Sequence, residues 1–545
     1  MLMDSKLTIG CVGSTENSLW LAILSTLARS CGLNLRQVSA GGLDGLIGVV
    51  VLGKGPFGAE TQSLAEFRLV PVDGQVVQRV SVRFGSHPEV PEPFRNKELT
   101  TLCVVPEDAD ASSGSVMATA EGRPVWTSSV VEGRRHDTCW IAADTLDQVV
   151  GAFDRLNGKR FMDVLPVLEW MRAISGFYEW TRPPLRACLM FDDPNLHSLC
   201  YGHVDYARIA AEGRQHRYHT SFATVPFDAY YVNPAAARCF REHPDTLSLL
   251  VHGNNHTHRE LAGGKDQQER LAQMRQALQR MERLDQKAGL TTAKVMAPPH
   301  GACSEAMMRA MRDAGFEAAC ISPASLRSAN PDAMWKNDLG LYPAAMISGF
   351  PVIPRFRLEA QREGSIWLAM YLDQPLILVG HHWDLAEGTD LLAKTAKIIN
   401  GLGDVVWADL ATIARRNYRH RIESNRLRIQ PFCRILHVDV PEGVTEIEIE
   451  AAWKEDSSAR FVRCLHGEGL ISKLKIDAED NSETINVIPR SRINLKLTGV
   501  KSAPSAQTPP RTPLYAIVRR ILVEMRDRSM PYHTRNGIKG KVKKS

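Results

Sequence analysis

Short apolar runs alternate with amphipathic stretches through the middle of the chain. Four of these runs have the length of buried strands: residues 188–191, 249–251, 295–297 and 376–379. Between them, apolar residues recur every three or four positions, as at Leu271, Met274 and Leu278, which is the period of a helix packed on one side. This alternation is typical of a sheet covered by helices, so residues 181–418 are predicted to form an α/β domain of the (β/α) barrel type.

The first third of the chain has a similar rhythm. Residues 7–13 are predicted to form a strand, residues 18–30 a helix and residues 48–52 an apolar strand. This β-α-β succession predicts an open α/β domain over residues 1–180. Its glycines do not form the G-x-G-x-x-G motif of a dinucleotide site, so the sequence assigns this domain no role. Residues 107–122 are expected to form a loop.

From Leu427 onward the apolar period changes to two. Leu436 and Val438 alternate with polar residues, which predicts a β-rich, sandwich-like domain over residues 425–500. Residues 501–545 are predicted to be a linker, an amphipathic helix and a basic tail. The helix carries an apolar stripe: Leu514, Ile517, Val518, Ile521 and Met525. This stripe is expected to pack on the body of the protein, and the alternative is weak association with an anionic membrane surface.

Each of the four central runs leads into residues that can bind a metal or transfer a proton. They are Asp192 and Asp193, His252 and His256, His300, and His381 and His382. Enzymes with parallel sheets build their sites where such strands end. Adjacent residues on a strand point to opposite faces, so Asp192 and Asp193 need not have the same role. Two histidines and one carboxylate are a common catalytic zinc site.

This ordered set resembles the polysaccharide deacetylases of the NodB-homology superfamily, which comprise carbohydrate esterase family 4 and its relatives. Those proteins have a paired-Asp motif, a His-x-x-x-His motif, an Arg-Pro-Pro-Tyr-Gly-like turn and a late strand that ends in His. The resemblance covers about residues 185–415 and implies a distorted (β/α) barrel. It implies that Asp192 is the general base. The metal ligands it implies are Asp193, His252 and His256.

The same resemblance implies that a backbone N–H near His300 binds the oxyanion and that His381 or His382 is the general acid. The sequence departs from the family pattern at two positions. Ala297 stands where the family has an arginine, and His300 stands where it has a tyrosine. The arginine orients the general base in the family, and Arg355 is the candidate replacement in this chain.

The chemistry of these residue types predicts a hydrolase. Zinc lowers the pKa of a bound water molecule toward ~7 and polarises an amide carbonyl. A second carboxylate can accept the proton of that water, and a histidine can protonate the leaving amine. Calcium and magnesium prefer oxygen ligands, whereas iron or cobalt is compatible with this ligand set.

The predicted function is therefore a metal-dependent deacetylase that hydrolyses an N-acetyl, or an O-acetyl, group on a saccharide. Tyr230 and Tyr231 could stack on a sugar ring or anchor their loop. Two alternatives remain open. One is a related C–N hydrolase with a non-sugar amide substrate, and the other is a non-catalytic carbohydrate-binding protein.

Charge and cysteine content narrow the classes of protein further. Much of the net charge of +5 comes from four residues of the tail: Lys539, Lys541, Lys543 and Lys544. The body therefore lacks the basic face of a nucleic-acid-binding protein. The eleven cysteines are spaced singly without a C-x-x-C pair, which is typical of reduced thiols in the cytosol. No secretory signal and no apolar run near ~20 residues is visible, so the sequence predicts a cytoplasmic protein without a membrane span.

Overall fold

The computed structural model describes most of the chain. The described residues are 7–13, 18–39, 42–53, 63–73, 75–107, 114–142, 152–157, 160–263, 266–337, 339–358, 363–450, 460–466, 474–476, 482–499 and 509–535. The chain divides into two compact units. Residues 1–181, 334–342 and 362–372 belong to unit 1, and the remaining residues belong to unit 2.

Unit 1 is built on a nine-stranded sheet of order β2-β1-β3-β4-β9-β8-β7-β5-β6. The strands are β1 Thr8–Val12, β2 Asn34–Gln37, β3 Gly48–Leu52, β4 Ala65–Val72, β5 Gln78–Phe84, β6 Glu98–Cys103, β7 Ser115–Ala120, β8 Arg123–Val131 and β9 Arg134–Ala142. The pairs from β2 to β9 are parallel and those from β9 to β6 are antiparallel. The helices are α1 Ser18–Ser30, α2 Ala152–Asn157, α3 Leu165–Ile174 and α9 Glu363–Tyr371.

The predicted strand, helix and strand at the start of the chain are confirmed as β1, α1 and β3. The loop predicted at residues 107–122 is wrong over residues 115–120, which form β7. The sequence of β7 has no strong alternation of apolar and polar residues. It becomes a strand because β5 and β8 supply partners on both sides, and the tight turn at Glu121 and Gly122, both at positive φ, leads directly into β8.

Unit 2 contains a ten-stranded sheet, hereafter the central sheet, of order β17-β18-β16-β15-β14-β13-β10-β20-β19, with β21 paired to β10. The strands are β10 Leu185–Asp192, β13 Thr220–Thr224, β14 Leu247–His252, β15 Thr292–Ala297, β16 Ala318–Ile321, β17 Ala345–Ile347, β18 Phe350–Pro354, β19 Phe356–Arg357, β20 Leu376–Gly380 and β21 Val405–Trp407. All pairs except β17 with β18 are parallel.

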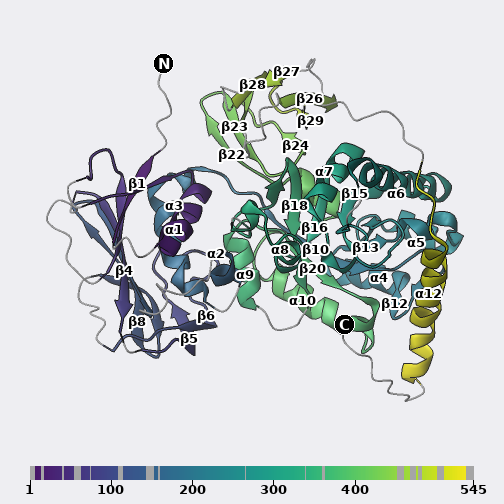
Figure 1. Cartoon of the computed structure of the whole chain (residues 1–545), viewed down its shortest axis with the longest axis horizontal. Coiled ribbons are helices and arrows are strands. Elements are labelled where there is room, and N and C mark those ends of the chain that lie inside the picture. Colours follow the sequence, from purple (N-terminus) through teal and green to yellow (C-terminus); the bar gives the residue numbers. More distant parts are fainter. Residues whose placement is uncertain are drawn as a thin grey trace. The chain divides into compact units, whose positions relative to one another are not determined.

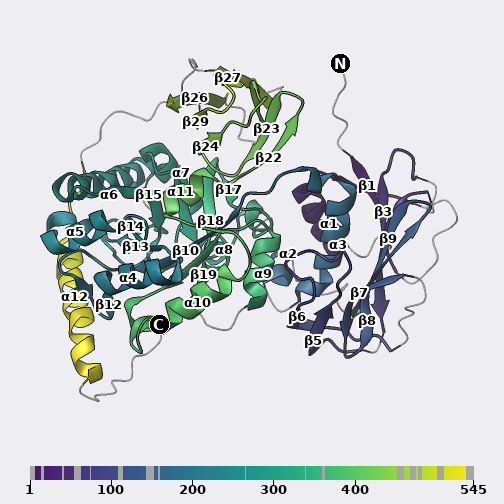
Figure 2. The same cartoon turned by 180° about the vertical axis from the view of Figure 1, so that it is seen from behind.

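Helices lie around the central sheet in both views (Figures 1 and 2). They are α4 Tyr206–His216, α5 Pro234–Glu242, α6 Gln267–Ala288, α7 Glu305–Ala314, α8 Pro323–Ala329, α10 Asp390–Asn400 and α11 Leu410–Arg415. Only Arg355 separates β18 from β19. β18 pairs with β16, and β19 pairs with β20, which lies toward the other end of the strand order. Among the described residues the strand pairs do not close the sheet into a ring. The fold is therefore mixed α/β, and the barrel stays a prediction.

The register of the central sheet determines where the strand ends meet. Asp192 on β10 is level with Ala223 on β13, and His252 on β14 is level with Ala297 on β15. On the other side of β10, Phe191 is level with Gly380, the last residue of β20. Because these strands are parallel, the residues that follow them emerge at one edge of the sheet.

Two four-stranded sheets follow the central sheet along the chain. One has the order β22-β23-β25-β28 and the other β24-β29-β26-β27. Their strands are β22 Tyr418–Glu423, β23 Arg426–Pro431, β24 Ile435–Asp439, β25 Glu446–Glu450, β26 Arg460–His466, β27 Leu474–Ile476, β28 Ser482–Asn486 and β29 Arg492–Gly499. Side chains of both sheets, among them Ile447 and Leu495, share one apolar core. The period of two therefore reports a β-rich region correctly.

The last helix, α12 Leu514–Arg535, packs in the opposite orientation to the one expected. Its apolar stripe was predicted to face the protein, but Val518, Ile521 and Met525 are about half exposed or more. Over residues 514–529, where the burial of the helix is described, the buried residues are Ala516, Arg520 and Asp527. The prediction failed because the inward face of the helix carries charges with partners on the protein body: Arg520 pairs with Asp228, and Asp527 accepts a hydrogen bond from Tyr201. No helix in the described part of the chain is both long and apolar enough to cross a membrane.

Candidate metal centre

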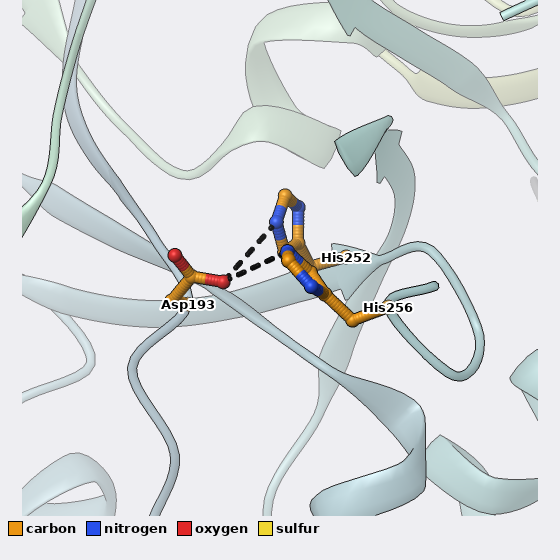
Figure 3. Close-up of side chains that lie close together, drawn as sticks. All are labelled: Asp193, His252 and His256. Atoms are coloured by element: carbon orange, nitrogen blue, oxygen red, sulfur yellow. Dashed lines mark ion pairs between the residues drawn. The ribbon is translucent and has the colours of Figure 1, made fainter. Parts of the chain in front are cut away.

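Three side chains at the edge of the central sheet converge on one point (Figure 3). Asp193 directly follows β10, His252 ends β14, and His256 lies four residues further on in the loop. Asp193 Oδ1 lies 3.0 Å from His256 Nε2 and 3.6 Å from His252 Nε2. One ligand atom from each residue falls within 4.8 Å of the others. The structure thus brings together the three residues that the sequence analysis proposed as metal ligands.

Hydrogen bonds hold the two imidazoles in place. His252 Nδ1 is 2.8 Å from the carbonyl oxygen of Ala297, so this nitrogen donates and Nε2 keeps its lone pair toward Asp193. Glu260 is buried and accepts backbone N–H groups of Asn254 and His256 at 2.7 and 3.1 Å. This carboxylate therefore fixes the loop that carries the second histidine. The sequence analysis missed it, because a glutamate eight residues after His252 has no distinguishing spacing.

The backbone at the site is strained. Asp193, His256 and His300 all have positive φ, at 86°, 54° and 57°. For residues other than glycine this conformation costs free energy of about 1–3 kcal/mol at each position, and it is retained where the surroundings impose it. The positive φ of Asp193 turns this residue out of the line of β10, and its side chain points toward the two histidines. Asp192, which precedes it on the strand, points elsewhere.

The donor set fits a divalent transition metal. Asp193 Oδ1 is buried and faces His256 Nε2 at 3.0 Å. Burial lowers the pKa of His252 to about 4, although the charge of Asp192 opposes the shift, so this imidazole is neutral at neutral pH. Burial raises the pKa of Asp193, but the charge and the hydrogen bond of His256 outweigh this effect and hold that pKa well below its usual value. A buried carboxylate and a neutral imidazole that converge in this way are suitable ligands for zinc.

A second buried pair lies beside the first. Arg355 Nη1 contacts both oxygens of Asp192 at 3.1 Å, and both side chains are less than a tenth exposed. Burial raises the pKa of Asp192, but Arg355, His252 and His381 lower it by more, so Asp192 is a carboxylate at neutral pH. The structure places Arg355, the candidate replacement for the missing arginine, directly on the proposed base.

The two histidines after β20 have different surroundings. His381 is partly exposed, and its ring stacks on Trp383 with 4.3 Å between ring centroids. Its charge also acts on Asp192. His382 is fully buried, and its Nε2 lies 3.6 Å from Asp527 Oδ1 of α12. His381 thus lies on the side of the proposed base, and His382 lies beneath the last helix.

The turn after β15 lies on the other side of the histidine pair. The ring of His300 is 5.6 Å from that of His256 and 5.5 Å from that of His258, measured between centroids. His300 and His258 are exposed, and neither belongs to the group of possible metal ligands. The structure therefore brings His300 near the triad without making it a ligand.

The last helix contributes residues to the site that the sequence did not point to. Arg520 is buried, and its Nε donates to Asp228 at 2.8 Å, while its Nη2 donates to the carbonyl oxygen of Asp193 at 3.2 Å. Arg519 donates to the carbonyl oxygen of His256. The adjacent arginines of this amphipathic helix were the available signal, but they predict a solvated face as readily as a buried one.

Replacement of Glu260 by glutamine tests the support of the second histidine. In the wild type, both oxygens of Glu260 accept backbone N–H groups of the loop. In the variant, an NH₂ group replaces one of these oxygens and cannot accept, so the loop should loosen around His256. We expect zinc affinity to fall about 10–100-fold, as for other partners of metal ligands. Competition titration with a zinc-binding dye measures it. Glu282→Gln, at an exposed position on α6, is the matched control. Equal affinity in the two variants would contradict the assigned role.

Comparisons with known proteins give structural neighbours alone. No family model matches the sequence, and no curated protein is significantly similar to it. A family 4 carbohydrate esterase from Streptomyces lividans, in complex with acetate, is 15% identical and covers 42% of this chain and 94% of its own, with a TM-score of 0.27. A CE4 esterase from Streptococcus mutans is 18% identical, with coverages of 42% and 87% and a TM-score of 0.26.

A CE4 family pseudoenzyme from Bacillus anthracis is also similar, with 13% identity, coverages of 43% and 67%, and a TM-score of 0.26. The neighbours therefore include both esterases and a protein described as a pseudoenzyme. At TM-scores this low they do not establish a shared activity. The function is inferred instead from the side chains of the site.

Proposed function

We propose that this protein is a metal-dependent deacetylase that hydrolyses an N-acetyl, or an O-acetyl, group on a saccharide. The observation that carries the proposal is the pairing of two sets of residues at one sheet edge. Asp193, His252 and His256 form a metal-binding triad, and the ionised Asp192 lies beside it on Arg355. A triad alone could be structural, whereas a triad with a second carboxylate next to it has the parts of a hydrolase.

Each residue has a defined task in this proposal. A divalent transition metal held by the triad would polarise the acyl carbonyl and acidify water. Asp192 accepts the proton of the attacking water, and Arg355 holds that carboxylate in one orientation. The turn at His300 offers a backbone N–H to the oxyanion. His381 donates a proton to the leaving amine, because it is partly exposed beside Asp192 whereas His382 is fully buried.

The saccharide in the proposal is supported by aromatic surface near the site. Trp383 is 43% exposed and lies stacked on His381, where a flat apolar face next to the acid could bind a sugar ring. The Asp192–Arg355 pair also favours catalysis over the alternative of a carbohydrate-binding protein that lost activity. Ala297 stands where the family has an arginine, and Arg355 supplies a guanidinium to Asp192 in its place. The experiment below distinguishes a saccharide substrate from a non-sugar amide.

The test is acetate release before and after metal removal. N-acetylglucosamine oligomers are the sugar probes, and an acetyl-lysine peptide is the non-sugar probe. We expect the purified protein to contain about one transition metal ion per chain, to release acetate from the sugars, to lose this activity on chelation and to recover it with zinc. Release that survives complete chelation would contradict the mechanism. Release from the peptide alone would favour the other C–N hydrolase, and sugar binding without release would favour the binding protein.

A further inference from the structure

The outward face of α12 is a continuous apolar surface. Six large apolar side chains on this face are 49–75% exposed: Leu514, Tyr515, Val518, Ile521, Leu522 and Met525. Their spacing of three, four, seven and eight residues places them on one side of the helix. Soluble monomers rarely expose a contiguous apolar surface of this kind, so it indicates a partner.

The helix cannot bury this surface by rolling on the protein body, because its opposite face is held by charged contacts. Arg520 is paired with Asp228 in a buried position. Asp527 is fully buried and accepts the hydroxyl hydrogen of Tyr201 at 2.8 Å. Breaking such buried contacts would leave charges without partners, which is strongly unfavourable. The contacts therefore hold the apolar face outward.

Two exposed tyrosines lie beside the helix, next to His197. His197 contacts Glu524 of α12 at 2.8 Å. The ring of His197 lies 4.9 Å from that of Tyr230 and 5.8 Å from that of Tyr231. Tyr230 is 64% and Tyr231 49% exposed. Tyrosine rings, which are apolar with one polar end, are favoured at the interface between water and lipid.

The charge of this region is the opposite of that of an anionic bilayer. Residues 514–545 contain nine lysine and arginine residues and two acidic residues, in a chain whose net charge is only +5. Arg526 lies at the border of the apolar face with a side chain 56% exposed. Basic residues around an apolar helical face attract anionic lipid headgroups while the apolar side chains enter the acyl boundary. A second copy of this chain would bring two such basic segments together.

We propose that α12, bordered by Tyr230 and Tyr231, docks the protein on the surface of an anionic lipid bilayer. The helix lies in the plane of the interface, with Arg520 and Asp527 toward the protein and Val518 and Leu522 toward lipid. This docking does not depend on the proposed function, because the surface would bind lipid whether or not the metal centre is catalytic.

Sedimentation of the full chain with vesicles tests the proposal. The vesicles are phosphatidylcholine alone or phosphatidylcholine with phosphatidylserine. The helix variant is Val518→Glu with Leu522→Glu. The matched control is Ile422→Glu with Ile488→Glu, at apolar positions that are 53% and 48% exposed on the β-rich region. We expect the wild type and the control to bind the anionic vesicles at least ten times more than the neutral ones, and the helix variant to lose this binding.

Binding of the wild type should also weaken with added salt, as electrostatic attraction to a charged surface requires. Equal sedimentation with both kinds of vesicle, or undiminished binding of the helix variant, would overturn the proposal. So would a wild-type dimer that the helix variant converts to a monomer, without vesicle binding, because a second copy would then cover the face. Lipid binding is measured without substrate, so these outcomes do not test the proposed deacetylase activity. That activity is tested by acetate release alone.

Discussion

Replacement of Asp193 by alanine is expected to remove the metal from the protein. Asp193 Oδ1 lies 3.0 and 3.6 Å from the two histidine nitrogens, and Asp193 is the one carboxylate residue of the triad. Loss of a direct ligand should lower zinc affinity by more than the ~10–100-fold typical of residues that only support a ligand. Elemental analysis of purified protein and a competition titration both measure the effect.

His258→Ala is the matched control for the metal-binding variants. His258 is exposed, lies two residues after His256 and is outside the group of possible ligands. It should keep about one zinc ion per chain, whereas His252→Ala should lose the metal as Asp193→Ala does. Added zinc should raise the thermal midpoint of the wild type and of His258→Ala, because an ion that binds only the folded state stabilises it. Full metal content in Asp193→Ala would disprove the assigned ligand set.

The second large effect is expected from Asp192→Asn, which should retain the metal and lose hydrolysis. The substitution keeps the shape of the side chain and removes the carboxylate that accepts the proton of the attacking water. Loss of a general base lowers the rate of the chemical step by ~10²–10⁴-fold. The readout is acetate release under saturating substrate, measured together with zinc content. Activity within a few fold of the wild type would exclude Asp192 as the base.

A companion variant separates catalysis from folding. Asp192→Asn leaves Arg355 buried without its charged partner, which can lower the free energy of unfolding by about 3–5 kcal/mol. The double variant Asp192→Asn with Arg355→Gln removes both charges, so its stability should recover while its activity stays low. Denaturant unfolding measures the stability. Activity that recovered with stability would show that the single variant had only unfolded the site.

Only part of this site could be predicted from the sequence, because the prediction depended on local patterns. Apolar runs that stop at polar residues mark the ends of buried strands, and β10, β14, β15 and β20 were each found in this way. The His252 and His256 pair was visible through its spacing. The spacing of residues in the sequence does not predict the register of the strands. The register pairs His252 with Ala297 and Asp192 with Ala223, and it sets where each of these residues lies along the sheet edge.

The sequence by itself determined which strands carry the candidate ligands, because the apolar runs mark the strands. It also determined that the ligands lie at the same edge of the sheet, because strands connected through a helix run parallel. Only the tertiary structure decided that Arg355 contacts a carboxylate 163 residues away, that Glu260 holds the ligand loop, and that α12 packs with Arg520 inward. The physical reason is that a buried charge is stable only beside its partner. That partner is chosen by the fold, and no local pattern in the chain records it.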